Sequence, residues 1–98
     1  MSQASNAVQR RLAKILRERK EPHGKSFKDK DILKGVEVNE SGLAELWIKP
    51  THPYCPCCIN DLIELRKQII SIKGILACHI EVVSIPQAQR WTAAINES

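Results

Sequence analysis

The 98-residue sequence has few aromatic side chains and no long hydrophobic run. Its aromatic residues are two tryptophans, one tyrosine and one phenylalanine. This low count, together with the lack of a recognisable nucleic-acid-binding motif, disfavours nucleic acid as a partner. No stretch approaches the roughly 20 consecutive apolar residues that a membrane-spanning helix needs. We therefore expect a protein that has no membrane segment.

The beginning of the sequence also lacks an apolar segment. Residues 1–7 are polar or small, so we expect no secretion signal and a cytoplasmic location. Nothing in the sequence indicates an oxidising compartment. The four cysteines are therefore interpreted as reduced thiols rather than as a disulfide framework.

Positive charge is concentrated near the N-terminus. The formal net charge is +4, and residues 1–30 hold nine Lys or Arg against three acidic residues. Two interpretations stay open. The charge either belongs to a solvated helix face with a tethered basic loop, or it attracts an acidic partner or nucleic acid.

Hydrophobic spacing predicts an amphipathic helix over residues 5–20. Its apolar face follows an i, i+4, i+7, i+8 pattern. The residues of that face are Val8, Leu12, Ile15 and Leu16. We expect residues 1–6 to be flexible and residues 21–31 to form a mobile basic loop, in which Phe27 is the only large apolar residue.

A β-hairpin is predicted next, with strands over residues 32–38 and 43–49 and a turn over residues 39–42. A buried helix follows, beginning at Cys55-Pro56 and ending before Gly74. Its apolar stripe consists of Cys58, Leu62, Leu65, Ile69 and Ile72. Residues 76–84 alternate between two sets that are both partly apolar, which predicts a third strand inside the sheet. A short helix or packed tail contains Ala88, Trp91, Ala94 and Ile95.

This order, α-β-β-α-β-(α), predicts one α+β domain over residues 1–98. Its two layers are a three-stranded mixed sheet and two helices that pack on it. The step from the second strand through the buried helix to the third strand should be a right-handed crossover.

Cys55 is the leading candidate for a functional residue. Proline is favoured at the first position of a helix, so Pro56 there makes Cys55 the N-cap. The exposed N–H groups and the helix dipole stabilise an anion at that point, which favours the reactive thiolate. The alternative is that Cys55 is merely a small residue in a tight turn.

The other thiols are weighed by helical and strand geometry. Cys58 lies near the face of Cys55 at i, i+3 and is either its partner or a core residue, whereas Cys57 points elsewhere. Cys78 is interpreted as a buried core thiol. Its neighbour His79 faces the opposite side of the strand, so the two cannot complete one zinc site with Cys55 and Cys58. His52 could approach Cys55 as a base or ligand.

The order of elements and the Cys-Pro turn together resemble the iron–sulfur cluster assembly domain of the SufT and PaaD-like family. The turn is carried by Thr51, Pro53, Cys55 and Pro56. Further matching segments are 73–75, 81–83 and 91–92. The resemblance covers most of residues 7–95.

The resemblance implies a non-enzymatic accessory factor that matures or delivers iron–sulfur clusters, with Cys55 as the thiolate that contacts iron or a client. Cys58 is the second expected metal ligand, ahead of Cys57 and His52, with Thr51, Pro53 and Pro56 supporting the turn. The cluster would be bound transiently. The implied partners are a cluster scaffold or carrier and client apoproteins. Because one cysteine leaves a cluster incompletely ligated, we also predict a homodimer.

Two other functions remain as alternatives. A Cys55/Cys58 dithiol would suit a thiol redox protein, although a thioredoxin fold needs a further hairpin and helix after residue 84. The basic first helix would suit a nucleic-acid or protein-interaction module.

Overall fold

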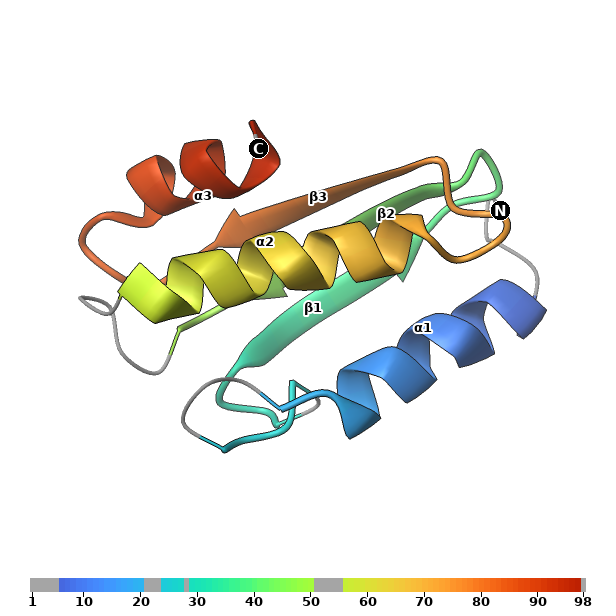
Figure 1. Ribbon diagram of the computed structural model, residues 1–98, viewed down its shortest axis with the longest axis horizontal. Helices are drawn as coiled ribbons and strands as arrows, with labels where there is room; N and C mark the ends of the chain where they lie inside the picture. The colour runs from blue at the N-terminus through green and yellow to red at the C-terminus, as the bar shows by residue number, and fades with distance from the viewer. Residues whose placement is uncertain (1–5, 21–23, 28, 51–55, 98) are drawn as a thin grey trace.

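Three helices and a three-stranded sheet form the computed structural model, which describes residues 6–20, 24–27, 29–50 and 56–97 (Figure 1). The elements in chain order are α1 (Asn6–Glu18), β1 (Leu33–Val38), β2 (Leu43–Ile48), α2 (Pro56–Ile70), β3 (Ala77–Val82) and α3 (Ala88–Asn96). This order and the α+β class confirm the prediction. Asn6, which was expected to be flexible, is already the first residue of α1, while residues 1–5 lie outside the described residues.

The sheet has the strand order β1-β2-β3 and is mixed, as predicted. β1 and β2 form the antiparallel hairpin, and β3 pairs in parallel with β2. The hairpin turn is held by Asn39, whose side-chain Oδ1 accepts hydrogen bonds from the N–H groups of Ser41 and Leu43, each at 3.0 Å. Gly42 closes the turn at a φ of +88°, a backbone conformation that L side chains disfavour.

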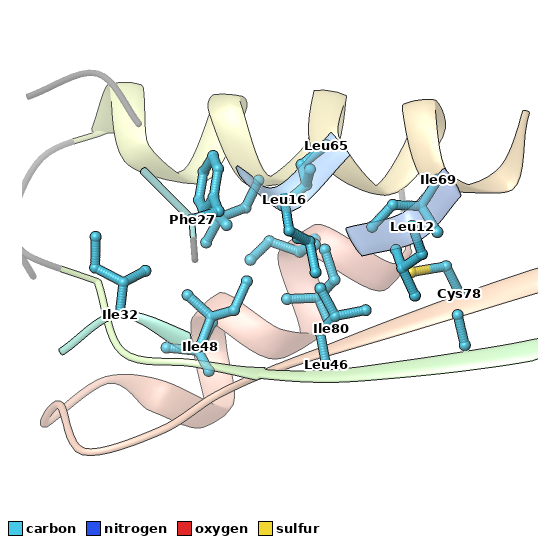
Figure 2. Packing of buried hydrophobic residues seen from close by; sticks show 14 of the residues in the cluster. Leu12, Leu16, Phe27, Ile32, Leu46, Ile48, Leu65, Ile69, Cys78 and Ile80 are labelled. Atoms are coloured by element: carbon cyan, nitrogen blue, oxygen red, sulfur yellow. The ribbon is translucent and has the colours of Figure 1, made fainter. Parts of the chain in front are cut away.

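The hydrophobic core lies between one face of the sheet and the helices. Figure 2 shows Leu65 and Ile69 of α2 above the sheet residues Leu46, Ile48 and Ile80. All five residues of the predicted stripe are buried, which confirms the core face, although α2 ends at Ile70, earlier than predicted, and Ile72 follows it. They are Cys58, Leu62, Leu65, Ile69 and Ile72. The predicted apolar face of α1 contributes Val8, Leu12 and Leu16 to the same core, with Ile15 packed against it.

The segment after α1 is anchored to the core. Phe27 is 2% exposed, and its N–H donates to the carbonyl of Arg19 at 3.2 Å. Ser26 Oγ donates to the carbonyls of Leu16 and Arg17, which are among the last carbonyls of α1 and have no partner within a helix. The prediction of a mobile loop over residues 21–31 missed this attachment. It gave more weight to the many charged residues of the segment than to Phe27, its only large apolar residue. Residues 21–23 and 28 lie outside the described residues.

β3 is an edge strand, which corrects the prediction that it lies inside the sheet. α3 packs along the outer edge of this strand, with Trp91 and Ile95 buried (Figure 1). The strand also begins one residue later than predicted. Leu76, expected on the buried face, precedes the strand and is 80% exposed. Ala94, predicted within the apolar face of the terminal segment, is exposed as well.

Within the part of the chain that the structure describes, no helix has the length and apolar character needed to cross a membrane.

Candidate functional site

The helix that carries the candidate thiols starts where the sequence predicted. α2 begins at Pro56, so Cys55 directly precedes the helix in the chain. Cys55 itself lies outside the described residues, as do Thr51, His52 and Pro53. The first turn of α2 contains no acidic residue that would neutralise the positive end of the helix dipole.

The loop before α2 leaves the sheet at the shared carboxyl end of the two parallel strands. Ile48 ends β2 and pairs with Val82, the last residue of β3. The carbonyl of Ile48 accepts a hydrogen bond from the N–H of Val83 at 3.0 Å. The N–H of Lys49 donates to the carbonyl of Ile32 at 2.8 Å. In sheets with parallel strands and helical crossovers, this edge is the usual position of a functional site.

Cys58 belongs to the core. It is 5% exposed and lies on the same helix face as Leu62 and Leu65. This burial fits the interpretation of Cys58 as a core thiol. The residue lies in the first turn of α2, close in the chain to Cys55. Cys57 is part of α2, but its side chain lies outside the described residues.

Cys78 lies at the opposite end of the core. Figure 2 places its sulfur beside Leu12 and Ile69, and Ile69 is 11 residues along α2 from Cys58, which corresponds to about 16 Å of helix. Cys78 is 3% exposed, and burial raises its pKa to about 11 even though the nearby Arg66 guanidinium lowers it. A thiol in this state is a poor nucleophile and metal ligand at neutral pH.

His79 points away from Cys78, as the alternation of strand side chains predicted. Its side chain is 44% exposed, and Nε2 lies 3.7 Å from Glu81 Oε1 on the side of the sheet that points away from the core. Among the described residues, no group of three or more His, Cys, Asp or Glu side chains can hold a metal ion.

Sequence reasoning missed one polar contact beside the start of α2. Arg19 Nη2, at the end of α1, lies 2.9 Å from Asp61 Oδ1, and Arg19 Nη1 donates to Gln68 Oε1 at 2.8 Å. Arg19 and Asp61 are 42 residues apart, so no local pattern links them. The two contacts fix the residue that follows α1 against the middle and the last turn of α2.

Comparison with known proteins identifies the fold. No protein-family model matches the sequence, and no curated protein matches it. Among solved structures, the fold is similar to the crystal structure of the domain of unknown function DUF59 from Bacillus anthracis, with a TM-score of 0.65 and 19% sequence identity. The match covers 82% of this chain and 77% of that chain. The chain therefore has the α+β fold of a DUF59 domain.

Proposed function

We propose that this protein is an accessory factor in iron–sulfur cluster assembly or delivery, in which Cys55 contacts iron or a client protein. The observation that carries the proposal is the start of α2 at Pro56, directly after Cys55, within a DUF59-like fold. The DUF59 family includes the SufT and PaaD-like domains that the Cys-Pro turn of this sequence resembles. The likeness in fold and the likeness in sequence motif thus support the same function.

The chemistry proposed for Cys55 follows from its place in the chain. A thiolate next to a helix N-terminus is stabilised by the unpaired N–H groups of the first turn and by the helix dipole. Thiolates are soft ligands that suit iron–sulfur clusters. The cluster is the cargo in this proposal, and the protein itself catalyses no reaction.

One cysteine cannot complete the ligand set of a cluster. Cys58 is the second candidate ligand, followed by Cys57 and His52. Because Cys58 is buried, it could bind iron only if α2 moved or if the cluster reached the thiol from the N-terminal end of the helix. A cluster scaffold, a carrier, a client apoprotein or a second copy of the chain would supply the remaining ligands. Because such binding is shared, we expect the cluster to be transient.

The thiol redox alternative loses support from the fold. A thioredoxin fold requires a further hairpin and helix after residue 84. The described residues after β3 instead form one helix, α3. Formation of a Cys55–Cys58 disulfide with a defined potential, together with reduction of insulin, would restore that alternative.

Anaerobic reconstitution with ferrous iron and sulfide tests the proposal. The wild-type protein should develop a thiol-dependent visible chromophore that Cys55→Ala abolishes. Cys78→Ala is the matched control, since Cys78 is buried at the far end of the core and should not affect the chromophore. An unchanged chromophore in Cys55→Ala, or none in the wild type together with no binding to a cluster-carrying protein, would contradict the proposal.

A further inference from the structure

Three glutamates of the strands lie on the face of the sheet that points away from the core, where His79 also lies, 3.7 Å from Glu81. Along β2 and β3 the buried residues alternate with half-buried or exposed ones, and the latter include Glu45, Trp47 and Glu81. Glu37 of β1 lies directly opposite Glu45 in the antiparallel register. We call these four residues the open face. Like charges directly opposite each other in a sheet are destabilising, so a cation placed between Glu37 and Glu45 would lower the free energy of the fold.

The outward side of α1 is basic. Arg10, Lys14 and Arg17 are exposed and spaced i, i+4, i+7, which aligns them along one side of the helix. Within the described part of the chain, none of the three is close enough to a carboxylate to form an ion pair. We call these three residues the basic stripe. It lies opposite the apolar side of α1, which is fixed in the core by Leu12 and Leu16.

We propose that the open face of one copy binds the basic stripe of a second copy. This inference does not depend on Cys55 or on a cluster. The two surfaces belong to different sides of the same molecule, so the contact is head-to-tail. Such heterologous contacts extend into rings or open chains as the concentration rises.

The spacing of the charges supports this pairing. Arg17 lies seven residues after Arg10, which corresponds to about 10 Å along the helix. Glu45 and Glu81 lie on neighbouring strands, two positions apart along the register, which separates their backbones by about 8 Å. Two cations of the stripe can therefore meet two carboxylates of the open face at the same time.

Trp47 adds a second interaction at the centre of the open face. Its ring lies over Gly35, where an added Cβ would be only 3.0 Å from Trp47 Cε3. The indole thus packs on the glycine on one side, and Trp47 as a whole is half-buried. An arginine above an indole ring gains a cation–π interaction, for which Arg10 and Arg17 are candidates.

The charges of the open face disfavour the simplest symmetric dimer. Two open faces in contact would bring Glu37, Glu45 and Glu81 of each copy together, and such like-charge contacts oppose association. A second copy therefore has to present a cationic surface, and α1 is the element that offers one.

Charge reversal tests the contact by sedimentation over a range of protein concentrations. At low salt the average mass of the wild type should rise with concentration, and added salt should weaken the association at least about tenfold. Arg10→Glu/Lys14→Glu/Arg17→Glu and Glu45→Lys/Glu81→Lys should each remain monomeric. A one-to-one mixture of these two variants should associate again, because each now carries a complementary surface.

A matched control separates the stripe from net charge. Lys30→Glu/Lys73→Glu/Arg90→Glu changes the charge by the same amount at exposed positions outside α1 and should associate like the wild type. Circular dichroism checks that every variant is folded. A wild type that stays monomeric at low salt would overturn the proposal, and so would two variants that fail to associate when mixed. In the first case, titration with polyglutamate would show whether an acidic protein segment binds the stripe instead.

Discussion

Asn96 of α3 binds both backbone polar groups of Ile80, an edge residue of β3. Its Oδ1 accepts the Ile80 N–H at 3.0 Å, and its Nδ2 donates to the Ile80 carbonyl at 2.8 Å. The amide therefore takes the place of a neighbouring strand. Thr92 Oγ1 accepts the N–H of Val82 at 2.9 Å, and Arg66 Nε donates to the Cys78 carbonyl at 2.7 Å, so side chains satisfy the outer edge of β3 along its length.

Replacing Asn96 tests this edge contact. Asn96→Ala leaves the N–H and carbonyl of Ile80 without their partner, and we expect the free energy of unfolding to fall by about 1–3 kcal/mol in urea denaturation. Gln89→Ala, at an exposed position of the same helix, is the control and should change stability by less than about 0.5 kcal/mol. Equal stability of the two variants would show that the Asn96 contact contributes nothing.

The Arg19–Asp61 pair should couple measurably in a double-mutant cycle. The two side chains are 25% and 19% exposed, so solvent screens them only in part. Arg19 Nε and Asp61 Oδ2 are buried and have no hydrogen-bond partner among the described residues, which limits the gain. We expect a coupling free energy of about 1 kcal/mol. The exposed Glu64–Lys67 pair, at 3.9 Å, should give less than about 0.5 kcal/mol, and equal values for both pairs would contradict this account.

Phe27 should be the anchor of the segment after α1. Phe27→Ala removes a fully buried aromatic ring, and we expect a loss of about 3–5 kcal/mol in the free energy of unfolding. Phe27→Leu, which keeps most of the apolar volume, should lose less. A loss below about 1 kcal/mol for Phe27→Ala, measured by the same denaturation, would mean that the segment is not fixed by this side chain.

Two glycines with positive φ differ in their surroundings. A Cβ at Gly42 would lie 2.8 Å from the carbonyl oxygen of Gly74, whereas a Cβ at Gly24 meets nothing within 4 Å. Gly24→Ala should therefore cost about 1–2 kcal/mol from its backbone conformation alone. Gly42→Ala should cost clearly more in thermal or urea unfolding, because it adds a steric clash with backbone. Equal losses would contradict the close approach of the two turns.

The raised pKa of Cys78 predicts that the protein loses stability in alkaline solution. This pKa is raised from 9.0 to about 11 in the folded protein by burial. The folded state therefore holds the proton more tightly, and this contribution to stability is fully present below pH 9 and is lost as the pH rises towards 11. The loss should be on the order of 3 kcal/mol. Unfolding curves of the wild type and Cys78→Ala, measured over this pH range, separate the contribution of the thiol from that of other groups. An identical pH dependence in both proteins would contradict the burial of the thiol.

The order of elements was predictable because hydrophobic periodicity is local. The stripe from Cys58 to Ile72 has helical spacing, and residues 43–48 alternate, so each pattern identified both an element and its buried side. The edge position of β3 was not evident from its alternation, because the side chains that bind its outer edge, Asn96 and Thr92, lie 10 to 16 residues away in the chain. The anchoring of Phe27 and the Arg19–Asp61 contact were missed for the same reason.

The candidate site was predictable in part. Pro56 marked the start of α2, and strand alternation separated Cys78 from His79, because both features follow from local backbone geometry. The burial of Cys58 depends on how α2 packs on the sheet, so the sequence left its role as ligand or core residue open. The role of Cys55 is chemical and stays a prediction.

Cluster transfer measures the proposed function most directly. Wild-type protein reconstituted anaerobically with iron and sulfide is mixed with apo-aconitase, and the recovery of aconitase activity is followed against a control with free iron and sulfide. The account predicts faster recovery with the wild type and with Cys78→Ala, and recovery no faster than the control with Cys55→Ala. Equal recovery with Cys55→Ala and the wild type would contradict the assignment of Cys55 as the iron or client contact.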